Sequence, residues 1–241
     1  QPIACNHCGP HYTLREKSGI VIDDYSTIRR RLAAVLSGGG VVALKGIGGY
    51  NLICDPFSPM AVRRLRVLKE RPHKPFAVMV PDMETARRFV FLSRREEAVL
   101  SSWRRPILLA RQRRVLASAI NEGYCTLGLM LPFQPVHYHI FSDSGLKALV
   151  FTSGNKKGYP LCADDDEAVV QLLEGIDILV AYNRNIYNRV DDSVVRVIAD
   201  APRLLRRARG YVPDPLPADM QVEGVFAAGA ERTNHFAIGK G

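Results

Sequence analysis

Several features that define whole classes of protein are missing from this 241-residue sequence. No apolar run approaches the ~18 residues that cross a membrane, and no signal peptide is visible, so neither a membrane protein nor a secreted protein is expected. The five cysteines form no even disulfide framework, which favours a reducing cytoplasm as the location. No internal repeat is present. Because the first residue is Gln1 and not methionine, we expect the sequence to be a fragment of a longer protein.

The composition, with 47% hydrophobic and 24% charged residues, is typical of a globular protein. Basic residues outnumber acidic ones by 33 to 24, which gives a formal net charge of +9. This balance suits an anionic ligand such as a nucleotide, a phosphate or a nucleic acid, although ordinary surface charge is the alternative. Basic clusters on helix faces are usually solvated, so only those beside proline, glycine or strand ends are candidates for a site.

Short apolar runs alternate with amphipathic segments along most of the chain. We expect strands at 41–44, 50–54, 76–80, 107–110, 127–131, 148–151, 178–181, 194–198 and 204–210, and helices at 26–37, 59–68, 135–141 and 164–173. Two further helices should start after caps at Asp82 and at Ser93, where Ser93 and Glu96 fit a capping box, while Ser26 should cap the first helix. The irregular spacing predicts an α/β (α+β) fold with a twisted mixed sheet and flanking helices.

The stretch Lys69-Glu70-Arg71-Pro72-His73-Lys74-Pro75 places three cations within six residues, with prolines between them. Proline biases the residue before it toward extended geometry, so Arg71 and Lys74 cannot sit on a regular helical face. The sequence therefore predicts a stiff cationic segment at the end of a helix, called the strap (residues 69–75) below.

Two polar turns follow buried strands. Thr152-Ser153-Gly154-Asn155 places hydroxyls, a glycine and an amide at a strand end, a good cradle for a phosphate or an oxyanion. Lys45 is followed by Gly46-Ile47-Gly48-Gly49, whose glycines would let backbone amides approach a ligand closely. This glycine pattern lacks the dinucleotide-binding spacing, and a simple tight turn is the alternative.

Cys5 and Cys8 form a C-x2-C pair whose spacing lets two thiolates reach one zinc ion. One such pair fills half of a tetrahedral shell, so we expect an incomplete zinc site whose partner ligands lie outside this sequence.

The K-x-R of the strap and the S-x-N of residues 153–155 resemble the nucleotide site of the YrdC-like fold. Further segments, in order, resemble the YrdC-like domain of the HypF-type carbamoyltransferases of hydrogenase maturation. The matching segments are KGIGGYNL (45–52), KERPHKPFAVM (69–79), LGLMLPFQPVH (127–137), TSGN (152–155), NRNIYNRVDDSVVR (183–196) and RRARGYVP (206–213).

This resemblance implies three parts in the chain. Residues 1–19 would end a zinc-finger region, 20–213 would be the YrdC-like nucleotide-binding domain, and 214–241 would be a linker and the truncated start of the carbamoyl-transferring domain. In such proteins carbamoyl phosphate yields carbamate, which is joined to ATP as carbamoyl adenylate. The carbamoyl group then passes to the C-terminal cysteine of HypE and becomes the cyanide ligand of nickel–iron hydrogenase. This chain would retain the adenylation step at most.

The resemblance also assigns roles to residues. Lys69 and Arg71 would bind the triphosphate with support from Lys74, and Ser153 and Asn155 would donate hydrogen bonds to phosphate or to the carbamoyl group. Lys45, Gly46, Gly48 and Gly49 would hold the small acyl substrate, unless Lys45 only anchors the end of its strand. Arg189, Arg206 and Arg209 are further phosphate candidates, with a surface role as the alternative. Mg2+ is expected with ATP; Asp191 and Asp192 could hold it, although pairing with arginine is the favoured role for both.

Two other functions fit parts of this pattern. A synthase that makes threonylcarbamoyl adenylate for tRNA modification would share K-x-R and S-x-N, but should lack the C-x2-C start and the tail at 225–241. A double-stranded-RNA-binding module would use a basic face and contact phosphate and sugar. The sequence shows no stacking aromatic residues beside its basic runs, which makes nucleic acid an unfavoured partner.

Overall fold

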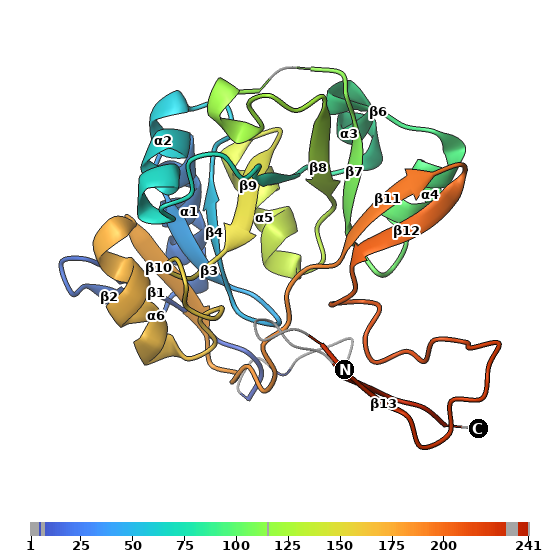
Figure 1. The fold of residues 1–241 in the computed structure, drawn as a ribbon. Helices are drawn as coiled ribbons and strands as arrows, with labels where there is room; N and C mark the ends of the chain where they lie inside the picture. Colours follow the sequence, from blue (N-terminus) through green and yellow to red (C-terminus); the bar gives the residue numbers. More distant parts are fainter. Residues whose placement is uncertain (1–4, 6–7, 115, 230–235, 241) are drawn as a thin grey trace.

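The computed structural model describes residues 5, 8–114, 116–229 and 236–240. Its main feature is one twisted mixed sheet in the order β12-β11-β7-β8-β5-β9-β4-β3-β10-β1-β2, with β6 paired to β7 (Figure 1). The strands are β1 (Tyr12–Glu16), β2 (Val21–Ile22), β3 (Val42–Lys45), β4 (Tyr50–Cys54), β5 (Ala77–Met79), β6 (Val90–Phe91), β7 (Ile107–Gln112), β8 (Thr126–Met130), β9 (Leu149–Ser153), β10 (Ile178–Tyr182), β11 (Val194–Ile198) and β12 (Ala201–Arg206). The predicted twisted mixed sheet is confirmed, since β3/β10, β5/β8 and β7/β11 are parallel and the other pairs are antiparallel.

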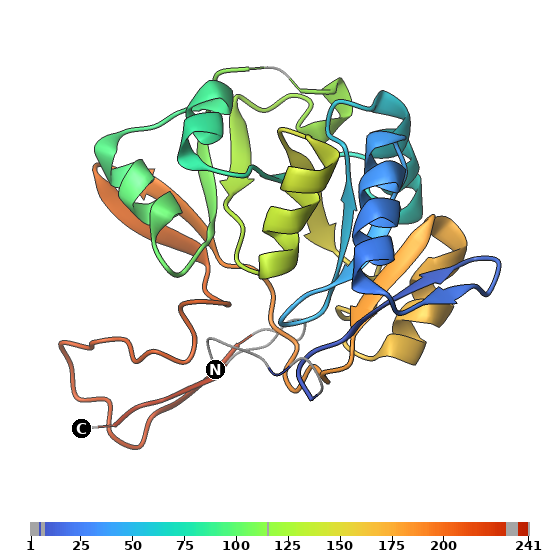
Figure 2. The ribbon, with the colours of Figure 1, turned by 180° about the vertical axis from the view of Figure 1, so that it is seen from behind.

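Helices cover both faces of this sheet. They are α1 (Tyr25–Ser37), α2 (Pro59–Leu68), α3 (Met83–Phe89), α4 (Arg94–Ser101), α5 (Pro135–Ser144) and α6 (Asp165–Leu172), with short 3-10 turns η1 (Ser118–Ile120) and η2 (Leu173–Gly175). Figure 2 shows α1 and α5 side by side on one face, where Leu32 and Ile140 belong to the same buried cluster. On the other face α2, α3, α4 and α6 bury a second cluster that includes Leu65 and Leu172. Alternation of side chains along the strands feeds both clusters, which explains why the central strands β3, β8, β9 and β10 are mostly apolar.

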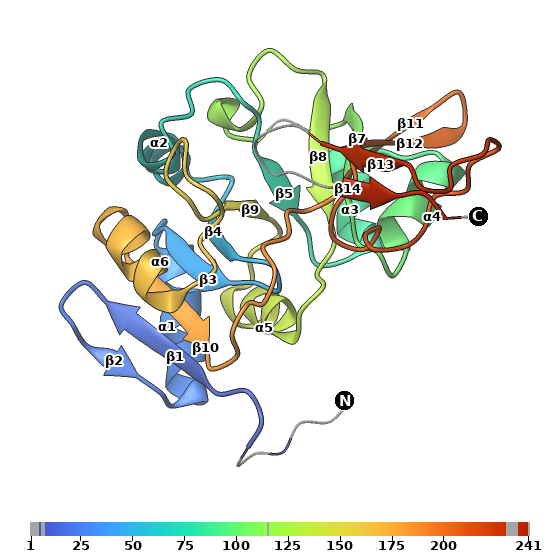
Figure 3. The same ribbon diagram turned by 60° about the horizontal axis from the view of Figure 1, so that its bottom comes forward.

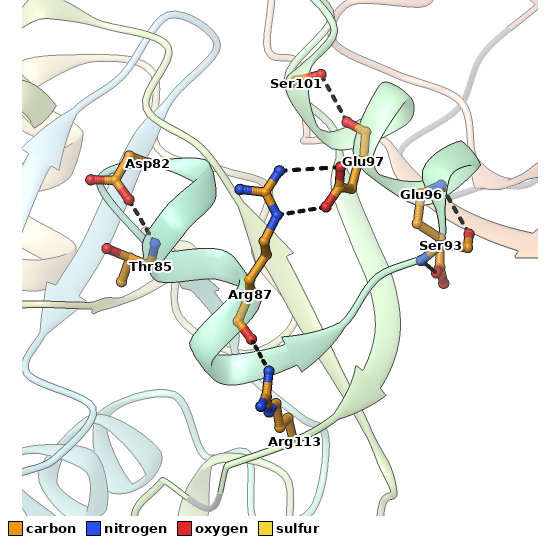
Figure 4. Close-up of polar contacts among 8 residues, drawn as sticks. All are labelled: Asp82, Thr85, Arg87, Ser93, Glu96, Glu97, Ser101 and Arg113. Carbon is orange, nitrogen blue, oxygen red and sulfur yellow. Dashed lines mark hydrogen bonds and ion pairs between the residues drawn. The ribbon is translucent and has the colours of Figure 1, made fainter.

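The helix starts follow from local capping. Ser58 accepts a hydrogen bond from the backbone amide of Ala61, and Pro59 lies in the first turn of α2, where the predicted helix 59–68 begins. Asp82 caps α3 through Thr85, and the predicted capping box of Ser93 and Glu96 is present (Figure 4). These bonds satisfy amides that a helix leaves without partners at its N-terminus.

Helices α3 and α4 are also tied to each other and to the strand beside them. Arg87 of α3 forms a double hydrogen bond with Glu97 of α4, and its carbonyl accepts from Arg113, which follows β7 (Figure 4). Ser101 donates back to the carbonyl of Glu97 within α4. These contacts hold the pair of helices against the β7 side of the sheet.

Three expectations about boundaries need correction. Asp24, not Ser26, caps α1, because its carboxylate accepts from the amide of Thr27 and the helix already begins at Tyr25. The last strand of the sheet is Ala201–Arg206, not 204–210, because its pairing with β11 ends at Arg206. The strand β1, which the sequence did not indicate, pairs with β10, so the sheet begins before residue 20.

Near the end of the chain, β13 (Phe226–Ala228) and β14 (Phe236–Ile238) pair antiparallel. They form a separate two-stranded sheet away from the main one (Figure 1), and both strands are labelled in Figure 3. All six residues are exposed, which is the state of a hairpin without a further sheet or helix to pack against. None of the described helices is long and apolar enough to span a bilayer.

Candidate functional site

A cavity of about 690 Å³ opens where the strap, the end of β9, the loop after β3 and the loop before β11 converge. Its floor is apolar, with Ala77 of β5 opposite Gly128 of β8 in the sheet. A Cβ added at Gly128 would lie 3.1 Å from the Ile107 side chain, which is tighter than ordinary packing. Glycine at this position therefore lets the side chains of the floor pack closely without filling the cavity. The charged residues of the lining are Arg71, Lys74, Arg196, Arg206, Arg209, Asp191 and Asp192. A low, apolar floor beneath a cationic rim suits a ligand with a flat apolar part and an anionic part.

Three of these cations have few protein partners and also act on one another electrostatically. Arg71 donates a long bond of 3.3 Å to the Thr152 hydroxyl, and its Nε is buried without a hydrogen-bond partner among the described residues. Burial lowers the pKa of Arg71, and the charges of Arg66 and Arg206 add to that effect. Burial lowers the pKa of Lys74 as well, followed by the repulsion of Arg71 and Arg206.

Arg206 is the third member of this group. Its Nε donates to the backbone carbonyl of Asp192 at 2.7 Å, while its ion pair with Asp191 is long, at 3.8 Å. Arg71, Lys74 and Arg206, the rim cations, therefore repel one another across the cavity, and Asp191 acts on them as an opposing charge. Such an excess of partly buried positive charge is costly until an anion enters.

Lys69, by contrast, is already surrounded by acceptors. Its Nζ contacts the carbonyls of Ser153 and Asn155 at 2.7 and 2.6 Å, the Asn155 Oδ1 at 2.7 Å and the Ser153 Oγ at 3.4 Å. The side chain is 5% exposed and does not line the cavity. Burial, with the nearby Arg71 charge, lowers the pKa of Lys69 to about 8. An ammonium has three donors, so this one is fully used in shaping the 152–155 turn.

Ser153 and Asn155, the other two predicted ligands in this turn, differ in whether they reach the cavity. Ser153 lines the cavity and donates to the Asn155 Oδ1 at 2.8 Å. Asn155 does not line it, because its amide nitrogen donates to the carbonyl of Tyr159 at 2.7 Å. The structure thus brings Ser153, not Asn155, to the ligand space.

Lys45 is held behind the glycine turn. Its Nζ lies 2.6 Å from the Asp165 carboxylate and 3.0 Å from the Tyr182 carbonyl, and the side chain is 2% exposed. The Tyr182 hydroxyl in turn donates to the carbonyl of Gly46 at 2.9 Å, and Tyr50 donates to Asp165 at 2.8 Å. This geometry favours the alternative in which Lys45 anchors the end of its strand.

The glycine turn itself reaches the cavity through Ile47, Gly48 and Gly49, while Gly46 lies outside the lining. An added side chain at Gly48 would come within 2.3 Å of the Val190 carbonyl, and one at Gly49 would come within 2.2 Å of Leu161. Glycine is required here because two neighbouring loops approach the turn backbone directly.

Arg189 and Arg209, two other arginines predicted as phosphate ligands, both have protein partners. The Nε of Arg189 donates to the carbonyl of Leu161 at 2.8 Å, and its guanidinium pairs with Glu167 at 3.1 Å, outside the lining. Arg209 lines the cavity, but its nitrogens are engaged by Asp192 at 2.8 Å and by the carbonyl of Arg105 at 2.9 Å. We therefore assign Arg189 and Arg209 to holding loops together.

Arg206 and Arg209 also correct a sequence inference. A strand over 204–210, as expected from the sequence, would place Arg207 and Arg209 on one face and Arg206 on the other. Because β12 ends at Arg206, that alternation does not continue: Arg206 and Arg209 both reach Asp192, and Arg207 bonds the carbonyl of Asp214.

An aromatic wall with a buried histidine closes one side of the cavity. The guanidinium of Arg209 lies 3.8 Å from the ring centre of Phe133, which packs edge-on against His137 and near Phe151. The Nε2 of His137 has no hydrogen-bond partner among the described residues. Burial, and then the charge of Arg209, lowers the pKa of His137 to about 3. His137 is therefore a neutral structural residue.

Metal ligands are sparse in the described part of the chain. No group of three or more His, Cys, Asp or Glu residues there could hold a metal ion. Cys5 and Cys8 are exposed, and a pair of thiolates alone does not complete a zinc shell. The described residues therefore do not fit a closed zinc site, and the incomplete site remains a prediction.

Comparison with known proteins assigns the chain to a family. A family model described as telomere recombination (Sua5, YciO and YrdC) matches residues 34–208. The chain belongs to the Sua5/YciO/YrdC family. Every lining residue of the cavity except Arg209 falls within the matched range.

Within this family the chain is similar to part of HypF. The carbamoyltransferase HypF of Rhizobium leguminosarum bv. viciae is 41% identical over 219 residues, which cover 88% of this chain and 29% of that protein. A crystal structure of full-length HypF in a phosphate- and nucleotide-bound form has a TM-score of 0.85 at 40% identity, covering 95% of this chain and 29% of that one. The resemblance to the YrdC-like domain of HypF is thus confirmed, and the chain spans less than a third of such proteins.

The alternative synthase is a more distant relative. The threonylcarbamoyl-AMP synthase of Vibrio vulnificus (strain YJ016) is 26% identical over 157 residues, which cover 63% of this chain and 84% of that protein. The YrdC-like domain is therefore shared with that enzyme class, while the higher identity and longer coverage lie with HypF.

One argument against nucleic acid needs correction. The expectation that no stacking aromatic lies beside a basic run is wrong. Trp103 directly precedes Arg104, whose guanidinium lies 4.6 Å from the Trp103 ring centre. The guanidinium of Arg111 lies 4.3 Å from the ring centre of Phe91, with Arg113 at 5.5 Å, because the pairing of β6 with β7 brings these segments together. Stacking aromatics are thus present beside a basic run, on a surface away from the cavity lining.

Proposed function

We propose that this chain binds ATP in the cavity and joins it to carbamate, forming carbamoyl adenylate and pyrophosphate. The observation that carries the proposal is the set of rim cations Arg71, Lys74 and Arg206, which face one cavity without adequate countercharge. The nucleotide-bound form of a HypF that is 40% identical supports the same use of the site. An incoming triphosphate relieves the repulsion among the rim cations, so binding energy is available where charge is densest.

The chemistry is displacement at the α-phosphate. An oxygen of carbamate attacks the α-phosphorus, the new O–P bond forms, and the bond to the β-phosphate oxygen breaks, so that pyrophosphate leaves with the electron pair. Arg71 and Lys74 would neutralise the oxygens on which charge builds. Ser153 would add a hydrogen bond to phosphate only by turning its hydroxyl away from the Asn155 Oδ1 to which it donates. The backbone amides of the glycine turn are the groups left to hold the small acyl part, because Lys45 is already ion-paired.

Mg2+ bound with ATP would offset further phosphate charge, and one carboxylate with the phosphates is a usual ligand set for it. Asp191 fits this role better than Asp192, because Asp191 lines the cavity with only a long contact to Arg206, whereas Asp192 is held by Arg209.

The larger role follows from the longer relatives. As part of a HypF-type protein, the chain would supply carbamoyl adenylate for transfer to the C-terminal cysteine of HypE in hydrogenase maturation. Residues 20–213 would carry adenylation, with 1–19 and 214–241 as the ends of neighbouring regions. Strand β1 lies before residue 20, so the folded unit takes in part of the first region.

Pyrophosphate exchange into ATP tests the proposal. Bicarbonate with ammonia supplies carbamate, and this mixture should support exchange, whereas either component alone should not. Threonine with bicarbonate serves as the competing substrate. Exchange that is faster with threonine than with carbamate would assign the chain to the threonylcarbamoyl-adenylate synthases instead, and binding of double-stranded RNA without exchange would point to a nucleic-acid module.

A further inference from the structure

The guanidinium of Arg66, in the last turn of α2, makes contacts that the adenylation chemistry does not explain. Its Nε donates to the carbonyl of Ala119 at 2.6 Å, and its Nη2 donates to the carbonyl of Ile120 at 3.2 Å. Its Nη1 donates to the carbonyls of Arg71 at 2.6 Å and Lys74 at 3.2 Å. One side chain thus ties both ends of the cationic part of the strap to the η1 turn.

The backbone of the same residue holds Arg71 from the other side. The amide of Arg71 donates to the carbonyl of Arg66 at 3.1 Å, and the amide of Glu70 donates to that of Val67 at 3.0 Å. These two bonds are the pattern of a Schellman motif, with Glu70 in the left-handed region at φ 45°. Arg71 is therefore fixed by Arg66 through both its amide and its carbonyl.

An aromatic ring sets the plane of the Arg66 guanidinium. Its central carbon lies 4.5 Å from the ring centre of Phe76, the residue that follows the strap. The amide of Phe76 donates to the carbonyl of Ile120, so the ring is itself anchored to η1. Arg66 does not line the cavity. Its position between the strap and η1 indicates a role in support of the strap.

We propose that Arg66 is a positioning residue that presents Arg71 and Lys74 to the phosphates. This inference rests on the proposed binding of ATP in the cavity. The two rim cations repel each other, so an unsupported strap would relax until they separate. Four carbonyls gathered on one planar guanidinium oppose that movement, because each accepts a charge-assisted hydrogen bond.

Arg66→Lys is the decisive variant, because it keeps the net charge and removes the planar fork. An ammonium cannot reach four carbonyls in one plane or stack as a guanidinium does. Affinities for ATP, ADP and AMP are measured by calorimetry for the wild type, for Arg66→Lys and for Arg63→Lys. Arg63 is exposed on the same helix and serves as the matched control.

A positioning role predicts a loss that grows with the number of phosphates. Arg66→Lys should weaken ATP about tenfold while AMP changes by less than about twofold, and Arg63→Lys should change neither. Equal losses for ATP and AMP, or no loss of ATP affinity, would overturn the role of Arg66. A wild type that binds ATP no more tightly than AMP would instead contradict the proposed function itself.

A measurement on the wild type covers the case in which Arg66→Lys does not fold. Nitrogen-15 NMR of the arginine Nε–H groups should show the Arg66 proton protected from exchange and unmoved by ATP, because its partners are backbone carbonyls. The Arg71 resonance should shift when ATP binds. An Arg66 resonance that shifts as far as that of Arg71 would make it a direct ligand and refute the positioning role.

Discussion

Two sets of cations lie in or around the cavity, and they differ in what their donors contact. Lys45, Lys69 and Arg209 donate to protein oxygens at 2.6–3.0 Å. Arg71 has one long contact to Thr152, a distance of 3.3 Å. The first set is part of the folded framework. The second set, the rim cations, keeps charge that an anion can neutralise.

The comparison shows that two cations of one short motif can have different roles. The K-x-R of the strap resembles a pair of phosphate ligands, yet Lys69 turns inward to shape the 152–155 turn and Arg71 faces the cavity. A buried ammonium needs all its donors satisfied, whereas a cation at a binding site must keep donors free. Removing a member of each set should therefore give opposite results in stability and in binding.

The largest effect is expected for Lys69→Met. It leaves the carbonyls of Ser153 and Asn155 without their donor, which should lower the free energy of unfolding by about 3 kcal/mol. Thermal unfolding measures this directly. Lys74→Met is the matched control on the same strap and should leave the unfolding temperature nearly unchanged. A Lys69→Met protein as stable as the wild type would erase the distinction between the two sets.

Arg71→Ala should do the reverse. Losing a charge-assisted hydrogen bond to phosphate costs about 1.5–3 kcal/mol, so ATP should bind about one to two decades more weakly. The unfolding temperature should stay the same or rise, because a repulsive charge is removed from the cavity. Arg203→Ala, exposed on β12 near Arg206, is the control and should keep wild-type affinity. Unchanged ATP affinity in Arg71→Ala would remove Arg71 from the binding set.

His137 adds an ionisable group that the framework keeps uncharged. Its pKa is lowered to about 3 in the folded protein, so between about pH 6.5 and 3 the unfolded chain binds more protons and stability falls as the pH falls. The slope should approach about 1.4 kcal/mol per pH unit. His137→Phe should flatten it, as followed by urea unfolding at several pH values, while the exposed His73→Gln retains it. An equally steep slope in His137→Phe would show that other groups control acid stability.

The smallest effect concerns the bend that separates the two strap cations. Glu70 adopts φ 45°, which disfavours residues with a side chain, so Glu70→Gly should stabilise the protein by about 0.5–1 kcal/mol. Glu70→Ala keeps the strain and should give no gain. Chemical denaturation can resolve this difference, and equal stability of the two variants would mean that the bend is not strained.

The sequence by itself determined the local features of this protein. Helix starts can be recognised at Ser58, Asp82 and Ser93, because a cap is a contact between residues three apart in the sequence. The strap at 69–75 and the alternation of apolar runs likewise follow from neighbours along the chain, which is why the mixed sheet and the family could be predicted.

Only the tertiary structure decided which polar groups are free. Lys45 meets Asp165 and Lys69 meets Asn155 across more than eighty residues, and no local pattern encodes those partners. The supporting role of Arg66 was missed for the same reason, since its acceptors on Ala119 and Ile120 are backbone carbonyls without a signature in the sequence. The sequence shows which side chains are charged. Whether such a side chain already has hydrogen-bond or ion-pair partners depends on the groups that the fold places around it.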